Sequence, residues 1–253
     1  MRLHPLPAFD DNYVWLLRDD AGRALVVDPG EALPVLAALG DAAPHAILLT
    51  HHHGDHVGGV PELLARWPQT PVFAPFDERI ATASQRVGDG DVVDAGPWRF
   101  NVLDIPGHTR SHIAFVGHGL LFCGDTLFSL GCGRMFEGRP AQMHASLKRL
   151  AALPGDTRVC CGHEYTLENA AFALTVEPGN PALQARRDQA RAQRDAGQPT
   201  LPSRLVDELA CNPFLRCHLP AVRAAAQRHA GQPLADEAAV FGTLRTWKDG
   251  FRA

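Results

Sequence analysis

The chain has 253 residues, of which 45% are hydrophobic, and it carries a formal net charge of −4 at pH 7, which suits one large domain or a large domain with a smaller one. The acidic balance disfavours nucleic acid as a partner, because proteins that bind it usually carry a basic face. No apolar stretch reaches the roughly 18 residues of a membrane-spanning helix, and prolines and acids occupy the N-terminus in place of a signal peptide's apolar core, so a cytoplasmic location without membrane contact is expected.

Apolar runs typical of β-strands recur up to residue 162. They lie at 24–28, 46–50, 71–74, 98–105, 112–117, 120–125 and 158–162. Helical patterns separate some of them, at 31–39, 60–67 and 140–153, and Pro140 suits the first turn of the last of these helices. Strands mixed with helices predict an α/β or α+β domain.

The pattern changes after His163, where no further strand is predicted. Helices are expected from Pro181 to about Gly197 and at 203–210, 219–230 and 236–249, with Asp236 as an N-cap and Gly231 as a C-terminal stop. The sequence therefore predicts domains at 1–165 and 166–253. Arg216 is expected to tie these two domains together. The six cysteines form no CxxC pair and are expected to be reduced and buried.

Residues 51–56 read His-His-His-Gly-Asp-His and directly follow an apolar strand. Imidazole and carboxylate are the usual ligands of zinc and of non-haem iron or manganese. His51 and His53 share one face of an extended segment. Gly54 lets the chain turn, so that Asp55 and His56 can address a second point. The segment is therefore predicted to straddle two metal ions.

Three later strands end in a glycine followed by a metal-binding residue type, namely His108, Asp125 and His163. Loops at strand ends can bring ligands together while the sheet fixes their positions. A lone Gly-His is usually a turn with an exposed histidine, but all three in order after HxHxDH form a specific pattern.

These motifs resemble the metallo-β-lactamase superfamily, whose signature is HxHxDH, and within it the glyoxalase II family of hydroxyacylglutathione hydrolases. The narrower likeness is carried by GCGRMFEG at 131–138, CGHEYT at 161–166 and RTWKDGF at 245–251. By this resemblance, the first domain is a four-layer αββα sandwich and the second is a small all-helical domain that binds glutathione.

The resemblance further implies two divalent metal ions held by seven side chains, all of the expected residue types. Metal one takes His51, His53 and His108, metal two takes Asp55, His56 and His163, and Asp125 bridges both. Zinc is expected, with iron or manganese as alternatives. Asp28, at the end of its strand, is expected either to support a ligating histidine or to be a turn residue before Pro29.

Such a site generates a nucleophile from water, since even one zinc ion lowers the pKa of its bound water to about 7. A thioester carbonyl suits this chemistry, because no serine or cysteine nucleophile is then required. Asp55 and Asp125 are expected to be catalytic. The resemblance implies a monomer that hydrolyses S-D-lactoylglutathione to glutathione and D-lactate, the second step of methylglyoxal detoxification.

Glutathione is anionic, and Arg245 and Lys248 share one face of the predicted last helix. The resemblance assigns them the glycine carboxylate; the alternative is a solvated basic edge. It also implies substrate contacts from Arg134, Phe136 and Tyr165. The family often has lysine at 134 and tyrosine at 136, so Arg134 keeps the charge with a different geometry, and Phe136 lacks a hydroxyl donor.

Other functions compete with this one. Lactone or β-lactam hydrolysis is disfavoured, because neither substrate needs paired cations on a helical appendage. A persulfide dioxygenase with a single iron shares much of the ligand set but is expected to lack the RxxKDxF tail. A nucleic-acid-processing hydrolase on the same scaffold is disfavoured by the acidic charge. A non-catalytic metal-binding protein would hold metal without turnover.

Overall fold

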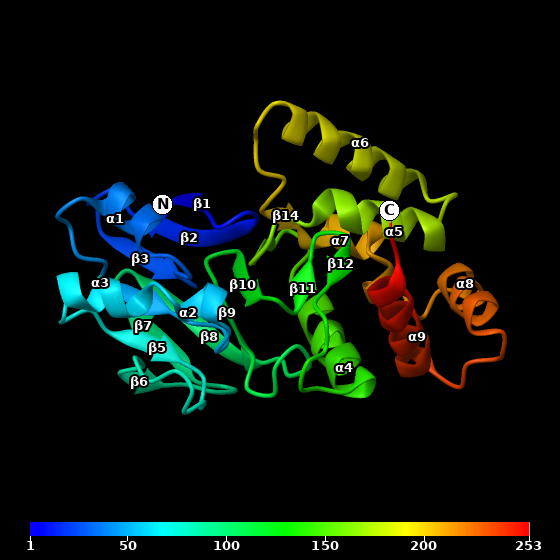
Figure 1. Cartoon of the computed structure of the whole chain (residues 1–253), viewed down its shortest axis with the longest axis horizontal. Coiled ribbons are helices and arrows are strands. Elements are labelled where there is room, and N and C mark those ends of the chain that lie inside the picture. The colour runs from blue at the N-terminus through cyan, green and yellow to red at the C-terminus, as the bar shows by residue number, and fades with distance from the viewer. Residues whose placement is uncertain (253) are drawn as a thin grey trace. The chain divides into compact units, whose positions relative to one another are not determined.

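The computed structural model describes residues 1–252 (Figure 1). By its contacts the chain divides into two compact units. Unit 1 comprises Met1–Asp104, Ser111–Gly124 and Cys160–Glu164, and unit 2 comprises Ile105–Arg110, Asp125–Val159 and the chain from Tyr165 onward. Both units draw on segments from before and after the middle of the chain.

The first sheet of unit 1 has six strands in sequence order. They are β1 (Arg2–Ala8), β2 (Asn12–Arg18), β3 (Ala24–Val27), β4 (Ala46–Leu48), β5 (Val72–Ala74) and β6 (Gln85–Arg86). The first three pair antiparallel, and β3 to β6 pair in parallel. Helices α1 (Leu33–Leu39) and α3 (Val60–Arg66) connect these strands and lie against the sheet (Figure 1).

Side chains that alternate along β2 divide the core of unit 1 into two layers. Val14 and Leu16 pack with Val35 of α1 and Leu63 of α3. Trp15 points the other way, and its ring centroid lies 6.5 Å from that of Phe122 in the second sheet. This alternation is the strand period of two, with both faces buried.

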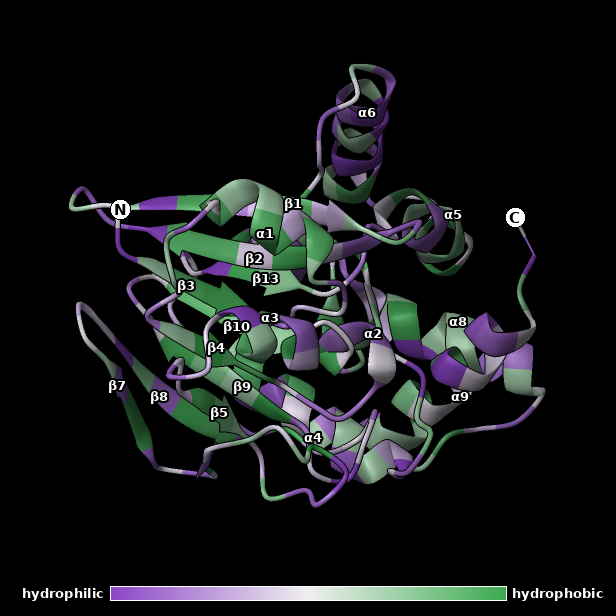
Figure 2. Cartoon of the chain, turned by 60° about the vertical axis from the view of Figure 1, so that its left-hand side comes forward, coloured by the Kyte–Doolittle hydropathy of each residue, from purple (hydrophilic) through white to green (hydrophobic). Residues whose placement is uncertain are grey.

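The second sheet of unit 1 contains β7 (Val92–Ala95), β8 (Trp98–Asp104), β9 (Ile113–Gly117) and β10 (Leu120–Gly124), paired antiparallel in that order. Strand β13 (Arg158–Cys161) continues the sheet beside β10. Strands β3 and β10 are hydrophobic along their length in Figure 2, as expected for strands buried on both faces. Helices and two sheets thus give unit 1 three of the four expected layers.

Unit 2 is mainly helical. Its helices are α4 (Pro140–Ala151), α5 (Thr166–Val176), α6 (Pro181–Asp195), α7 (Leu205–Cys211), α8 (Pro220–Ala230) and α9 (Glu237–Gly250), with a short 3-10 turn η1 at Pro213–Leu215. A small hairpin, β11 (Leu127–Phe128) and β12 (Gly131–Cys132), precedes α4. The rings of Phe172, Phe214 and Phe241 pack 5.8–5.9 Å apart in its core. Helix α6 is largely hydrophilic (Figure 2).

Several predicted helix ends are confirmed. Pro140 lies in the first turn of α4, the Asp236 side chain accepts a hydrogen bond from the Ala239 amide, and Gly231 ends α8 with φ 69°. All six cysteines are free and buried, as expected. Among residues 1–252, no helix combines the length and the apolar character needed to cross a membrane.

Other expectations are wrong. A strand does follow residue 163, because Ser203 and Arg204 form β14, which pairs with Val159 and Arg158. Two residues are too few to give an alternating pattern, so the sequence hides this strand. Arg216 does not join the two predicted domains: its guanidinium donates to both oxygens of Glu177, at 2.8 and 3.0 Å, within the second domain.

Candidate metal centre

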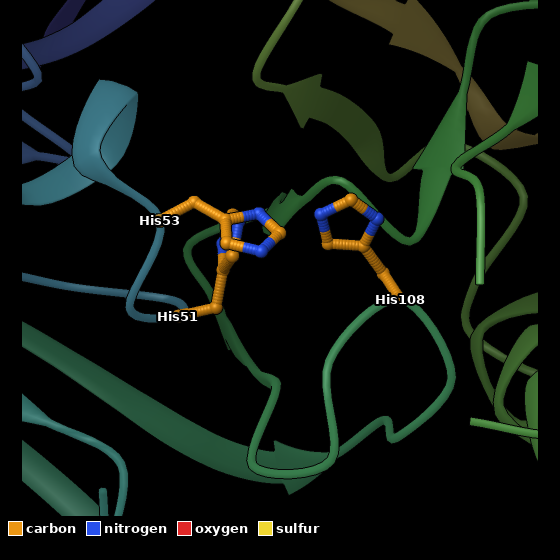
Figure 3. A group of neighbouring side chains, drawn as sticks. All are labelled: His51, His53 and His108. Atoms are coloured by element: carbon orange, nitrogen blue, oxygen red, sulfur yellow. The ribbon is translucent and has the colours of Figure 1, made fainter. Parts of the chain in front are cut away.

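His51 and His53 follow β4 in an extended segment that enters α2 (Gly54–Val57). Their rings turn toward one another, with 3.1 Å between His51 Nε2 and His53 Nδ1 (Figure 3). Two nitrogens bound to one tetrahedral zinc ion at its usual distances lie about 3.3 Å apart. The observed spacing therefore fits two ligands of a shared ion.

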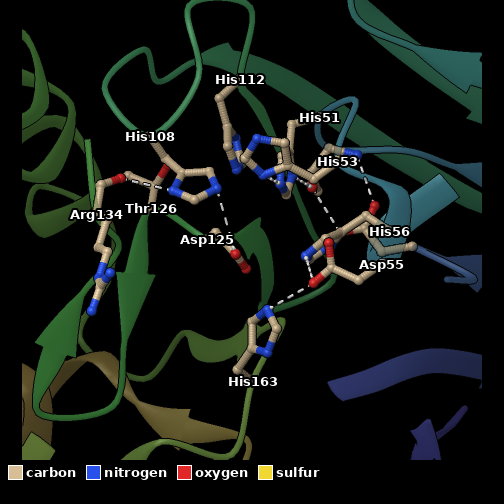
Figure 4. Close-up of polar contacts among 12 residues, drawn as sticks. His51, His53, Asp55, His56, His108, His112, Asp125, Thr126, Arg134 and His163 are labelled. Atoms are coloured by element: carbon tan, nitrogen blue, oxygen red, sulfur yellow. Dashed lines mark hydrogen bonds and ion pairs between the residues drawn. The ribbon is translucent and has the colours of Figure 1, made fainter. Parts of the chain in front are cut away.

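Helix α2 turns the chain so that Asp55 and His56 join His163, which follows β13. Asp55 Oδ2 lies 3.4 Å from His163 Nε2 and 3.7 Å from His56 Nε2 (Figure 4). Ligand atoms of these three residues all lie within 4.8 Å of one another. Gly30 permits this arrangement, because a Cβ at that position would lie 1.9 Å from the carbonyl oxygen of Asp55.

Asp28 determines which nitrogen carries the proton in two of the rings. His56 Nδ1 lies 3.0 Å from Asp28 Oδ2. A carboxylate only accepts, so Nδ1 donates and Nε2 bears the lone pair. Thr50 donates its hydroxyl to Asp28 at 2.7 Å, so this hydroxyl accepts from His51 Nδ1 at 3.1 Å. The supporting role expected of Asp28 is confirmed, and Thr50 joins it.

Two further residues that sequence reasoning did not assign support this half of the centre. Asp11 accepts a hydrogen bond from His163 Nδ1 at 2.7 Å. Asn12 donates from its side-chain amide to Asp55 Oδ2 at 3.0 Å and is itself 7% exposed. Both lie where β1 turns into β2, and the only signal in the sequence is a polar run between two strands.

His52 and His112 lie beside the ligands without facing the same point. His52 Nδ1 lies 3.4 Å from Asp77 Oδ2. His112 stacks on His51 with ring centroids 4.5 Å apart and donates from Nδ1 to the Ile113 carbonyl at 3.0 Å. His112 thus makes a structural hydrogen bond beside the candidate ligands.

In unit 2, His108 and Asp125 lie side by side at the wall of a cavity (Figure 4). His108 Nε2 is 3.5 Å from Asp125 Oδ2, and His108 Nδ1 donates to the Arg134 carbonyl at 2.8 Å. Four imidazoles of the predicted ligand set thus donate from Nδ1 to oxygen. Gly133 is required here, since a Cβ would lie 1.9 Å from the Asp125 carbonyl oxygen.

The cavity in unit 2 has a volume of about 690 Å³. Its wall includes His108, Asp125 and all five predicted substrate contacts, Arg134, Phe136, Tyr165, Arg245 and Lys248. Phe136 is 64% exposed, and Tyr165 meets Phe128 edge-on at 5.4 Å between ring centroids. The wall therefore combines metal-ligand types with cations and aromatic surface.

Arg245 and Lys248 are firmly held in this wall. Arg245 is 3% exposed and donates to the Cys132 carbonyl at 2.6 Å and to Asp249 at 3.1 Å. Lys248 donates to the side-chain oxygen of Asn169. Burial, with the nearby Arg245 charge, lowers the pKa of Lys248 to about 8. Arg245 is therefore buried within the cavity wall, and the half-buried Lys248 is tied to that wall through Asn169.

Two buried residues, Glu208 and Asn212, hold the hairpin β11–β12, which carries Cys132. Glu208, which is fully buried, accepts from the Leu130 amide at 2.7 Å. Asn212 donates to the carbonyls of Phe128 and Gly131 at 3.1 and 2.9 Å. Leu130 has φ 59°, a conformation that side-chain-bearing residues seldom adopt, and these bonds hold it there. Burial raises the pKa of the Glu208 carboxyl.

Comparison with known proteins supports this description. Residues 8–163 match the family model of the metallo-beta-lactamase superfamily, and residues 164–251 match that of the hydroxyacylglutathione hydrolase C-terminus. The chain is 62% identical over 252 residues to the hydroxyacylglutathione hydrolase of Xylella fastidiosa, covering 99% of this chain and 98% of that protein. This chain belongs to the hydroxyacylglutathione hydrolase family.

Solved structures share this fold. ETHE1 from Myxococcus xanthus aligns with a TM-score of 0.66 and 25% identity over 97% of this chain and 90% of its own. A protein crystallised in a di-iron-bound form aligns with a TM-score of 0.53 and 32% identity, over 63% of this chain and 91% of its own. The predicted metallo-β-lactamase fold with a C-terminal helical domain is confirmed.

Proposed function

We propose that this hydroxyacylglutathione hydrolase family member hydrolyses the thioester of S-D-lactoylglutathione to glutathione and D-lactate, the second step of methylglyoxal detoxification. One observation carries the proposal: a single cavity wall holds His108 and Asp125 together with the buried Arg245 and the half-buried Lys248. The high identity with the relative from Xylella fastidiosa supports it over the whole chain.

We assign two divalent metal ions to the seven predicted ligands. His51, His53 and His108 would hold one ion, Asp55, His56 and His163 would hold the other, and Asp125 would serve both. The fit is supported by the 3.1 Å spacing of the His51 and His53 nitrogens and by the lone pair that hydrogen bonding leaves on Nε2 of His56 and His163. Zinc suits this set of nitrogen and oxygen donors, as do iron and manganese.

When bound, the metal pair supplies a nucleophile from water at neutral pH and stabilises the charge that develops on the carbonyl oxygen. Asp55 and Asp125 would serve as ligands and would orient the attacking group. No side chain has to form a covalent intermediate, because a thiolate leaves without strong acid help. His51 and His56 are 0% and 1% exposed. The protein packed around these two side chains therefore limits the access of bulk water to them.

The cations of the cavity bind the peptide part of the substrate. Arg245 and Lys248 take the glycine carboxylate, since charge-assisted hydrogen bonds to carboxylates are the stronger kind. Tyr165 and the exposed ring of Phe136 offer aromatic surface to the peptide, and Arg134 adds a third cation. With phenylalanine at 136, the hydroxyl contact available to relatives with tyrosine is missing.

We further propose a domain boundary near residue 165, where the two family matches meet, and a cytoplasmic monomer. The persulfide dioxygenase and the nucleic-acid hydrolase are not favoured, because the match to the hydroxyacylglutathione hydrolase C-terminus runs to residue 251 and so includes the RxxKDxF tail.

The test is thioester hydrolysis, followed by loss of absorbance, on protein whose metal content has been measured. We expect turnover that depends on bound metal and falls by at least about 100-fold in Asp125→Ala, because even outer partners of metal ligands are worth 10- to 100-fold. Retained turnover in that variant would contradict the bridging role. Oxygen uptake with glutathione persulfide, without thioester hydrolysis, would favour the dioxygenase instead.

A further inference from the structure

We propose that Asn169 is a positioning residue for substrate binding, whose side-chain oxygen holds the Lys248 ammonium at the cavity wall where it meets a substrate carboxylate. The inference rests on the proposed function, which supplies the anionic substrate. Asn169, on α5, is not among the predicted substrate contacts. Its role is to position Lys248, which is one of them.

The amide of Asn169 has a fixed orientation. Asn169 is 1% exposed, and its Nδ2 donates to the Ser129 carbonyl at 2.9 Å. The amide nitrogen is therefore committed to the hairpin turn, and the oxygen faces the opposite way, where it accepts from Lys248 Nζ. Asn169 and Lys248 both line the cavity. The buried amide thus ties the tip of a long, flexible side chain to a rigid hairpin.

Gly131 provides the space for this amide. A Cβ at Gly131 would lie 2.5–2.7 Å from the side-chain atoms of Asn169, closer than such atoms can approach. The hairpin and α5 are therefore matched to each other at this point. Substitution of Gly131 offers a way to displace the amide without changing Asn169 itself.

The charge of Lys248 needs support, because burial and Arg245 lower the pKa of Lys248 to about 8. The charged and titratable groups around it come from each neighbouring element. They are Arg245 and Asp249 on its own helix, Glu168 and Tyr165 on α5, Cys132 and Arg134 on the hairpin and its following loop, and Arg252 after α9.

The side-chain oxygen of Asn169 favours the charged form of Lys248 over the neutral form. A carbonyl oxygen that accepts from an ammonium stabilises the charged form and keeps the pKa from falling further. Lys248 attracts a carboxylate only in its charged form. The fall of kcat/KM at alkaline pH, called the alkaline limb, therefore reports the ionisation of Lys248 in the free enzyme. We expect KM to rise, with little change in kcat, as pH increases through about 8.

Two substitutions at Asn169 should move this limb in opposite directions. Asn169→Leu removes the acceptor at similar volume, so the limb should move to lower pH by about one unit, the equivalent of one charged hydrogen bond. Asn169→Asp places an anion beside the ammonium, so the limb should move to higher pH. The measurements are kcat/KM for S-D-lactoylglutathione and competitive inhibition by S-methylglutathione, which has no free thiol to titrate, across the same pH range.

Three controls separate positioning from packing. Gly131→Ala should shift the limb in the same direction as Asn169→Leu. Thr166 lies on the same helix as Asn169 and makes a buried hydrogen bond to Thr200. Thr166→Val removes this bond and should leave the limb where it is in the wild type. In a Lys248→Met background this limb should disappear, and substitutions at Asn169 should have no effect on the pH dependence of kcat/KM.

The outcomes are distinct. A limb that stays in place in both Asn169 variants, while the thioester is still hydrolysed, would overturn the inference and leave Asn169 a packing residue. Shifts in the same direction for leucine and aspartate would also overturn it. If the Asn169 variants do not fold, the shift in Gly131→Ala decides. Metal-loaded wild type that does not hydrolyse the thioester would overturn the proposed function, and the inference with it.

Discussion

The side-chain amide of Asn12 donates a hydrogen bond to the Asp55 carboxylate, with 3.0 Å between Nδ2 and Oδ2. The same Asp55 oxygen lies 3.4 Å from His163 Nε2. Asn12 therefore fixes the carboxylate in the rotamer that brings it to the histidine. The turn between β1 and β2, which contains no predicted ligand, orients two of them, since the neighbouring Asp11 holds His163.

Asn12→Leu should weaken binding of one metal ion by about 10- to 100-fold, the usual effect of losing a partner of a metal ligand. Leucine has a similar volume but donates no hydrogen bond, so Asp55 is free to rotate. The measurement is metal content after dialysis against a graded chelator. Tyr13→Phe is the matched control, because it removes the neighbouring hydroxyl that bonds Glu164 at 2.9 Å. Equal metal retention in both variants would argue against this role for Asn12.

Arg245→Met together with Lys248→Met should raise KM by about 10- to 100-fold while kcat changes much less, since the lost contacts are made equally to ground state and transition state. Methionine retains the buried stems and removes only the charges. Steady-state kinetics with S-D-lactoylglutathione measures both constants. Arg252→Met, a substitution of an exposed cation of the same cavity, is the control. An unchanged KM in the double variant would move the peptide site elsewhere.

Asp77→Asn should destabilise the protein by about 1–3 kcal/mol at neutral pH and by clearly less at about pH 2, below the unfolded-state pKa. Hydrogen bonds from Arg79, and then from Ser111, hold the pKa of Asp77 far below its ordinary value. A depressed carboxyl pKa contributes stability above the unfolded-state pKa, and this stability is lost as pH falls toward the folded-state pKa. Urea unfolding at the two pH values measures the difference. An equal loss at both would show that the charge is not involved.

Glu208→Ala should lower stability by about 1–3 kcal/mol and raise KM, whereas Glu208→Gln should be tolerated. Alanine leaves the buried Leu130 amide without its acceptor and loosens the hairpin whose Cys132 carbonyl holds Arg245. Glutamine keeps an acceptor of the same shape. Thermal unfolding and steady-state kinetics on the two variants give the comparison, and a glutamine variant as damaged as the alanine one would point to a need for the carboxyl itself.

Strands that are buried on both faces could be predicted from sequence, because their apolar runs are continuous. The antiparallel pair β1 and β2 was not predicted. Strand β1 contains Pro5 and Pro7, and prolines are accepted there because β1 lies at the edge of its sheet. Helix α5 was also not assigned: it is buried on several sides, so it lacks the one-sided stripe on which helix prediction depends.

The candidate ligands could be predicted because residue type, glycine context and order along the chain all survive in the sequence. The oxygens that orient them could not. Thr50 and Asp11 have many ordinary roles, and only folding shows that they meet the rings of His51 and His163. The burial of Arg245 was likewise beyond the sequence, since a helix periodicity places it on a face but does not reveal what covers that face.

Four imidazoles are already turned by their Nδ1 hydrogen bonds to Thr50, Asp28, Arg134 and Asp11. Their orientation therefore does not depend on the cation. A demetallated preparation should keep its secondary structure and accept a foreign ion such as cobalt without denaturation and refolding. This makes the protein suitable for spectroscopic substitution, in which a coloured or paramagnetic ion reports on the coordination sphere during turnover.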